Sequence, residues 1–129
     1  VEFALFDFKL YQKLYKSEDE IQNLLDSIRN EFAAIIPPRY NKFQNGFSHI
    51  FSGGYSAGYY SYKWAEVLSA DAFYMFIDSG NIFNKDLGIK YKDTILSQGG
   101  SCDMDKLFFN FAQREPSVDS LLKIDGIIS

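Results

Sequence analysis

A single histidine and a row of tyrosines are the residues of this chain best suited to chemistry. His49 lies just before a pair of glycines at positions 53 and 54, and four tyrosines follow between positions 55 and 62. If a helix begins near Tyr55, then Tyr55, Tyr59 and Tyr62 are spaced i, i+4 and i+7 and share one helical face. Three phenols on one face beside an imidazole can form the polar wall of a binding cleft. The same rings can equally be ordinary core aromatics.

The tyrosines carry more information than the glycines. A buried tyrosine must find a hydrogen-bond partner, so a packing face is more simply built from Leu or Phe, which this chain uses freely elsewhere. Gly53 and Gly54 suit a tight turn, because glycine accepts a positive φ, and they equally suit the hinge of a mobile lid over a cleft. Their spacing fits neither a dinucleotide-binding fingerprint nor a P-loop, so no phosphate site is predicted.

The chain is poor in metal ligands. A catalytic zinc site normally takes three protein ligands and a water, but His49 is the only histidine and no His-Glu-x-x-His pattern is present. Taken alone, such a histidine is more typical of a structural residue than of a catalytic one. The single cysteine, Cys102, has no partner for an internal disulfide and no cationic neighbour in the sequence to activate it. We therefore predict that these residues hold no metal.

Composition narrows the class of protein and its partners. With 129 residues, 47% of them hydrophobic, the chain is predicted to form one folded region, 1–129, and not a disordered segment. A net charge of −4 without a basic cluster argues against a nucleic-acid partner. No apolar run approaches the roughly 20 residues of a membrane span, so no membrane partner is expected. One cysteine is typical of a reducing compartment, which predicts a cytoplasmic location.

Residues 1–16 predict a helix with apolar side chains almost all around it. Such a helix is buried on most of its surface, which suits an element of a larger protein better than the start of a free-standing one. The chain also opens in mid-pattern and without Met, so we expect a fragment. An isolated fragment would expose this helix as an apolar patch, and we expect a homodimer formed through it.

The next helix has clear start and stop signals. Ser17 and Glu20 form a capping-box pattern, and apolar residues at helical spacing run from Ile21 to Ile35. A pair of prolines at positions 37 and 38 then ends the helix.

The rest of the chain predicts a loop followed by further helices. Residues 39–54 form the loop, and a long helix over 55–78, rich in small residues, is predicted to be the buried centre of the fold. Shorter helical patterns follow at 85–96, with Asn84 as N-cap, at 103–111 and near the C-terminus. No strand-like alternation is present. The predicted fold class is all-α.

Residues 49–73 closely resemble the C-terminal signature of the thimet oligopeptidase family of zinc metallopeptidases. Within that family they are most similar to the branch of the bacterial oligopeptidase A and dipeptidyl carboxypeptidase enzymes. Shorter segments also resemble the family, so the resemblance covers nearly the whole chain: 1–8, 80–84, 95–101, 114–116 and 125–127.

The resemblance implies a cytosolic, mostly helical enzyme whose deep channel admits short peptides. Zinc is held in that family by a His-Glu-x-x-His helix and a downstream Glu, and these groups would lie upstream of Val1. This chain would then be the helical C-terminal fragment of a larger zinc peptidase, with the zinc ligands outside it. By itself it is expected to be inactive.

The resemblance also implies roles for the residues singled out above. His49 and Tyr62 match the family positions that contact the substrate and stabilise the oxyanion of the tetrahedral intermediate. Three further matches imply substrate binding. Gly53 and Gly54 match the hinge of a glycine-rich loop, and Tyr55 matches a tyrosine of that loop that closes on the peptide backbone. Tyr59 matches a cleft-facing tyrosine. Tyr60 and Trp64 have no such match and are expected in the core. The alternative is a non-catalytic helical binding or scaffold domain that keeps this fold.

Overall fold

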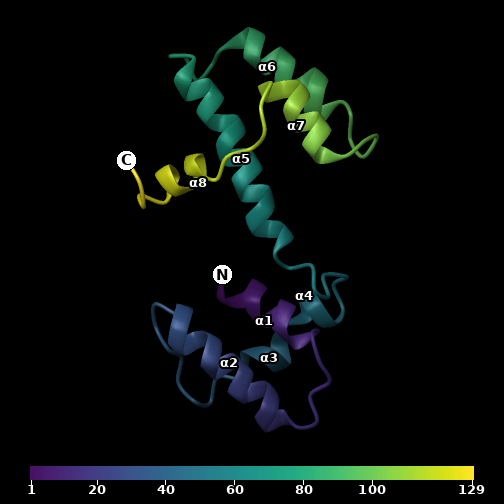
Figure 1. Ribbon diagram of the computed structural model, residues 1–129, viewed down its shortest axis with the longest axis vertical. Coiled ribbons are helices and arrows are strands. Elements are labelled where there is room, and N and C mark those ends of the chain that lie inside the picture. Colours follow the sequence, from purple (N-terminus) through teal and green to yellow (C-terminus); the bar gives the residue numbers. More distant parts are fainter. The chain divides into compact units, whose positions relative to one another are not determined.

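Helices are the only regular elements of the structure, a computed structural model that describes residues 1–129 (Figure 1). The all-α class predicted from the sequence is confirmed. The chain packs as two compact units, Val1–Lys63 and Trp64–Ser129. Each unit has a hydrophobic core of its own. None of the helices combines the length and the apolar character that a membrane crossing requires.

The first unit is built from α1 (Glu2–Leu10), α2 (Glu18–Phe32), α3 (Phe43–Gly46) and α4 (Ser48–Phe51). Helix α1 packs against α2, and the two short helices complete the core (Figure 1). The fully or nearly fully buried apolar residues of this core are Phe6, Leu25, Ile28, Phe47 and Ile50.

The predicted start of α2 is confirmed and its predicted end is wrong. The Ser17 hydroxyl accepts the Glu20 backbone N–H at 3.2 Å, which caps the first turn. The helix ends at Phe32 because Ala33 is already extended, with ψ of 129°. Ile35, the last residue of the helical apolar spacing, lies beyond that end, and its side chain is exposed. The side chain of the next residue, Ile36, is exposed as well.

The first helix is also shorter than predicted, since α1 ends at Leu10 and does not continue to residue 16. Phe6 and Asp7 are fully buried on the side that faces the core. Phe3 and Phe8 are more than one third exposed. The expectation that this helix is buried on most of its surface is therefore wrong for the chain as it stands.

The long helix α5 (Ser61–Asp78) begins six residues later than the predicted start at Tyr55. The physical reason is a turn in which Ala57 has a left-handed φ of 53°. The backbone N–H groups of Ala57 and Tyr59 donate to the Asp7 carboxylate, so they are not part of a helix ladder. Tyr55 and Tyr59 thus precede the helix that carries Tyr62, and the shared helical face predicted for the three is wrong.

The expected burial of α5 is also wrong in part. Its buried residues are Val67, Ala70, Asp71 and Ala72. Trp64 and, in the turn before the helix, Tyr60 are each about half exposed, so neither is the core residue that the sequence suggested.

The second unit contains most of α5, then α6 (Lys85–Tyr91), the π-helical turn η1 (Lys92–Leu96), α7 (Met104–Ala112) and α8 (Asp119–Ile124). The Asn84 side chain accepts the Leu87 backbone N–H at 3.1 Å, which confirms the predicted N-cap of α6. The buried core residues of this unit are Ala72, Phe108 and Phe111.

Asp71 ties the start of α8 to α5. Its fully buried carboxylate accepts two hydrogen bonds from the Arg114 guanidinium, at 2.6 and 2.7 Å. It also accepts the Ser117 backbone N–H at 2.8 Å and the Ser120 hydroxyl at 2.9 Å. Burial raises the pKa of Asp71, but these hydrogen bonds and the Arg114 charge together lower it by more. The net pKa therefore lies below the ordinary 3.8.

Candidate functional site

His49 and the three predicted tyrosines come together in the first unit, although they do not share a helix. The His49 ring on α4 lies edge-on to Tyr59, with 5.6 Å between ring centroids. Its centroid lies 6.2 Å from those of Tyr55 and Tyr62. We refer to these four residues, His49, Tyr55, Tyr59 and Tyr62, as the His–Tyr group.

The three tyrosines of this group also contact one another. Tyr55 stacks on Tyr62 with 5.2 Å between centroids and 25° between ring planes. Tyr59 contacts Tyr62 at 5.1 Å. Aromatic pairs at such distances stabilise a structure by about 0.5–1.5 kcal/mol each beyond their burial. The sequence therefore predicted that these rings lie together, but on a shared helical face that the structure does not have.

The members of the His–Tyr group differ in exposure. Tyr59 is partly buried, and its ring packs on the core residue Phe47 at 4.9 Å, so the core interpretation applies to Tyr59. Tyr55 and Tyr62 retain 36% and 42% of their surface exposed, and His49 is exposed as well. The group thus presents one imidazole and two phenols at the surface of the first unit.

The Tyr62 hydroxyl is biased towards its protonated state. A hydrogen bond with the Tyr55 side chain is the largest cause that raises the pKa of Tyr62 above the ordinary 10.0. Partial desolvation and the neighbouring phenols Tyr55 and Tyr59 raise it further. A phenol is protonated at neutral pH even at its ordinary pKa, so the raised pKa leaves the Tyr62 hydroxyl a hydrogen-bond donor, as in other tyrosines.

The glycine pair between His49 and Tyr55 is required by the local backbone. A Cβ on Gly53 would lie 2.9 Å from both the Cα and the carbonyl oxygen of His49, and Gly54 has a φ of +78°. The turn is closed by the Gly53 N–H donating to the Ser48 carbonyl at 2.9 Å and the Tyr55 N–H donating to the His49 carbonyl at 3.1 Å. These contacts are those of a tight turn, one of the two interpretations that the sequence left open.

Asp7 of α1 and Tyr11, the residue just after α1, hold the backbone on either side of this turn. The Asp7 carboxylate accepts the N–H groups of Ala57 and Tyr59, at 2.8 and 2.9 Å. The Tyr11 hydroxyl donates to the Ile50 carbonyl at 2.8 Å. Neither Asp7 nor Tyr11 was singled out from the sequence. The signal was present, because Asp7 lies between Phe6 and Phe8 in the middle of a helix predicted to be buried.

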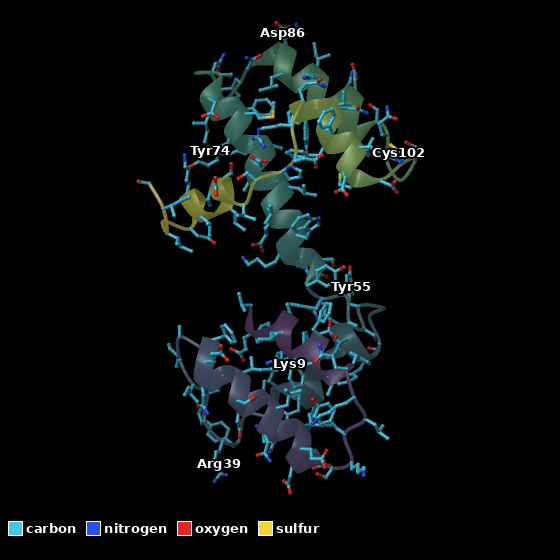
Figure 2. The ribbon with its side chains drawn as sticks, viewed as in Figure 1. Lys9, Arg39, Tyr55, Tyr74, Asp86 and Cys102 are labelled. Atoms are coloured by element: carbon cyan, nitrogen blue, oxygen red, sulfur yellow. The ribbon has the colours of Figure 1, made fainter.

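The structure also shows where the other candidate residues lie. Figure 2 labels Tyr55 in the turn before α5 and the exposed thiol of Cys102 in the loop before α7. No three His, Cys, Asp or Glu side chains come together in a group that could hold a metal ion. The donors of this chain therefore do not fit a catalytic zinc site.

Comparison with known proteins adds a family to this geometry. Residues 1–127 match peptidase family M3. Oligopeptidase A of Escherichia coli (strain K12) is 45% identical over 128 residues, which are 98% of this chain and 19% of that protein. Two proteins of Arabidopsis thaliana are each 43% identical over 133 residues and 100% of this chain, "Probable cytosolic oligopeptidase A" (19% of its length) and "Organellar oligopeptidase A, chloroplastic/mitochondrial" (17%). The chain thus spans about a fifth of the length of these curated relatives.

Proposed function

Because the chain belongs to peptidase family M3, we propose that it is the C-terminal part of an oligopeptidase that hydrolyses short peptides. The family match and the identity over the whole chain bear out the resemblance seen in residues 49–73. The relatives' names support peptide hydrolysis as the activity of the full-length protein. Within that protein, this chain is proposed to supply the substrate-binding and oxyanion-stabilising wall of the cleft.

The observation that carries this proposal is the exposed His–Tyr group. Its exposed Tyr62 side chain carries a hydroxyl that can donate a hydrogen bond at neutral pH, as an ordinary tyrosine does. A donor placed where negative charge develops stabilises the transition state of acyl transfer more than the ground state. Tyr62 is therefore proposed as the oxyanion donor, with His49 beside it to contact the substrate.

The other proposed substrate contacts lie in the turn before α5. Tyr55 stacks on Tyr62 and stands directly after the glycine pair, so a peptide that reaches Tyr62 also reaches Tyr55. Gly53 lets the turn pass close to the His49 backbone, and Gly54 supplies the positive φ that the turn needs, so the pair is proposed as the backbone that meets the peptide. Tyr59 supports the group from the core side and is proposed to reach the substrate through its partly exposed edge.

Zinc is implied by the resemblance to zinc peptidases, but the residues of this chain do not form its site. We propose that the zinc ligands belong to the part of the full-length protein outside this chain.

Both compact units of the chain are proposed to belong to one catalytic domain. The homodimer and the cytoplasmic location remain predictions. The two plant relatives differ in compartment by name, and Phe3 and Phe8 of α1 are available for a contact between copies.

The direct test compares this chain alone with the full-length protein. We expect the purified chain to bind no stoichiometric zinc and to leave a fluorogenic peptide intact. The full-length protein is expected to cleave the same peptide, and a chelator is expected to abolish that activity. Peptidase activity of the chain alone would contradict the proposal. A folded, zinc-loaded full-length protein without peptidase activity would favour the binding or scaffold domain.

A second prediction concerns the glycine turn. Gly53→Ala in the full-length enzyme places a methyl group 2.9 Å from the His49 backbone, so His49 and the turn must move apart. Because small displacements of positioning groups are costly, we expect kcat to fall about tenfold. Zinc content should stay unchanged.

Gly46→Ala is the matched control for this change. A Cβ on Gly46 meets no atom within 4 Å, so its kinetics should match those of the wild type. Gly54→Ala should also lower kcat, because its φ of +78° disfavours a side chain. Wild-type kinetics in the Gly53 variant would mean that the close approach to His49 has no part in turnover.

A further inference from the structure

Asp7 in helix α1 has a fully buried carboxylate, which accepts hydrogen bonds from the backbone of the turn before α5. Burial of a charged group is costly unless hydrogen bonds compensate it. Each carboxylate oxygen here has its own donor, Oδ1 from the Ala57 N–H and Oδ2 from the Tyr59 N–H. The acceptor lies 50 and 52 residues away from its donors in sequence. Such an arrangement fixes one piece of backbone relative to another.

The turn held by Asp7 has a conformation that needs support. Ala57 has a φ of 53°, which residues other than glycine, Asn and Asp seldom adopt. The Asp7 carboxylate bonds the N–H of that residue and the N–H two residues later. Without this acceptor, the local preference is a right-handed backbone, which would extend α5 towards Tyr55. Asp7 thus stabilises the turn that precedes α5.

The start of α5 in turn determines where the Tyr62 ring lies. The Tyr62 N–H donates to the Tyr59 carbonyl at 3.3 Å, so the residue bonded to Asp7 is also bonded to the first turn of the helix. The Tyr59 ring contacts both His49 and Tyr62. A shift of this backbone therefore moves three members of the His–Tyr group relative to one another.

From this geometry we propose that Asp7 is a positioning residue for the reaction: through the Ala57 and Tyr59 backbone it sets the place of the Tyr62 hydroxyl. Asp7 does not contact substrate itself. The inference rests on the proposed function, in which Tyr62 is the oxyanion donor. It goes beyond that function by assigning a role to a residue of α1 that lies outside the His–Tyr group.

The test is a double-mutant cycle in the full-length, zinc-loaded enzyme, with kcat and KM measured for a fluorogenic peptide. Asp7→Asn replaces one acceptor oxygen by an NH₂ group that faces a backbone N–H. We expect kcat to fall about tenfold with KM within about twofold of the wild type. In the Tyr62→Phe background the same change should cost less than about threefold, because the hydroxyl that Asp7 positions is already absent.

Asp71→Asn is the matched control, since Asp71 is an equally buried aspartate that accepts a backbone N–H but lies in the second unit. It should lower thermal stability while kcat stays near wild type. If Asp7→Asn does not fold, the cycle is run on Asp7→Asn with Ala57→Gly. Glycine relieves the left-handed backbone without restoring the anchor, so the same kcat loss and the same dependence on Tyr62 are expected.

The outcomes separate this inference from the proposed function. Suppose that Tyr62→Phe lowers kcat. If Asp7→Asn then keeps wild-type kcat, or lowers kcat by the same factor in the Tyr62→Phe background as in the wild type, the positioning role is refuted and the function stands. An equal loss of kcat in Asp71→Asn would likewise reduce Asp7 to a stabilising residue. Near-normal kcat in Tyr62→Phe would refute the proposed function and this inference together.

Discussion

Replacing Tyr62 by Phe in the full-length enzyme is expected to lower kcat by roughly 10²–10³-fold, about 3–4 kcal/mol, which is typical for the loss of one oxyanion donor. The change removes a single hydroxyl and keeps the ring that packs on Tyr55 and Tyr59. The oxyanion exists only in the transition state, so KM should stay close to that of the wild type. Steady-state kinetics on a fluorogenic peptide measures both constants.

Tyr60→Phe provides the matched control for this prediction. Tyr60 is the residue just before α5 and is half exposed. Its ring packs against Phe8, outside the His–Tyr group. The same loss of a hydroxyl there should leave kcat unchanged. A Tyr62→Phe enzyme with kcat similar to that of Tyr60→Phe would mean that the Tyr62 hydroxyl takes no part in the reaction.

The largest effect on stability is expected from Arg114→Ala. Removal of the guanidinium leaves the buried Asp71 carboxylate without its cation, and breaking a buried pair in this way typically costs 3–5 kcal/mol. Two features reduce the cost here. The Arg114 side chain is 46% exposed, so solvent already screens the pair, and Asp71 keeps the Ser117 and Ser120 donors. We expect a loss of about 2–3 kcal/mol in the free energy of unfolding.

Urea unfolding followed by circular dichroism measures this loss. Arg39→Ala removes the same charge from an exposed position (labelled in Figure 2) and should change the free energy of unfolding by less than about 0.5 kcal/mol. Equal unfolding midpoints for the two variants would show that the Asp71 pair contributes nothing to stability.

The same pair predicts the pH dependence of stability. The pKa of Asp71 lies below the ordinary 3.8 in the folded state, so between the two values the unfolded state binds more protons. The stabilisation is therefore complete above the ordinary pKa and is lost as pH falls through the lowered one. Arg114→Ala should flatten this part of the curve when unfolding is measured from about pH 6 to pH 2.

Features that depend on neighbouring residues could be predicted from the sequence. The caps at Ser17 and Asn84 are such features, because the side chain bonds a backbone N–H three residues later in each case. The all-α class follows in the same way from helical spacing of apolar residues. Helices α3 and α4 were missed because each has only four residues, which is too short to show a period.

The start of α5 could not be predicted, since it depends on a residue far away in sequence. The apolar and small residues from Tyr55 onwards favour a helix locally, but in the structure the Ala57 and Tyr59 N–H groups donate to the Asp7 carboxylate instead. The helical spacing nevertheless predicted that the rings of Tyr55, Tyr59 and Tyr62 lie together, as they do in the structure. A compact turn brings together residues that a helix would also have placed on one side.

The hydrogen bond between Asp7 and the Tyr59 backbone also determines which part of the chain is needed to move the His–Tyr group to another protein. An engineer who moves the His–Tyr group to another scaffold would naturally take the segment from His49 to Tyr62, which contains all four rings. That segment lacks the Asp7 acceptor and the Tyr11 donor, so we expect its turn at Ala57 to lose the bonds that hold it in place. The smallest portable piece that keeps these bonds is the whole first unit, Val1–Lys63, which brings with it the core on which Tyr59 packs.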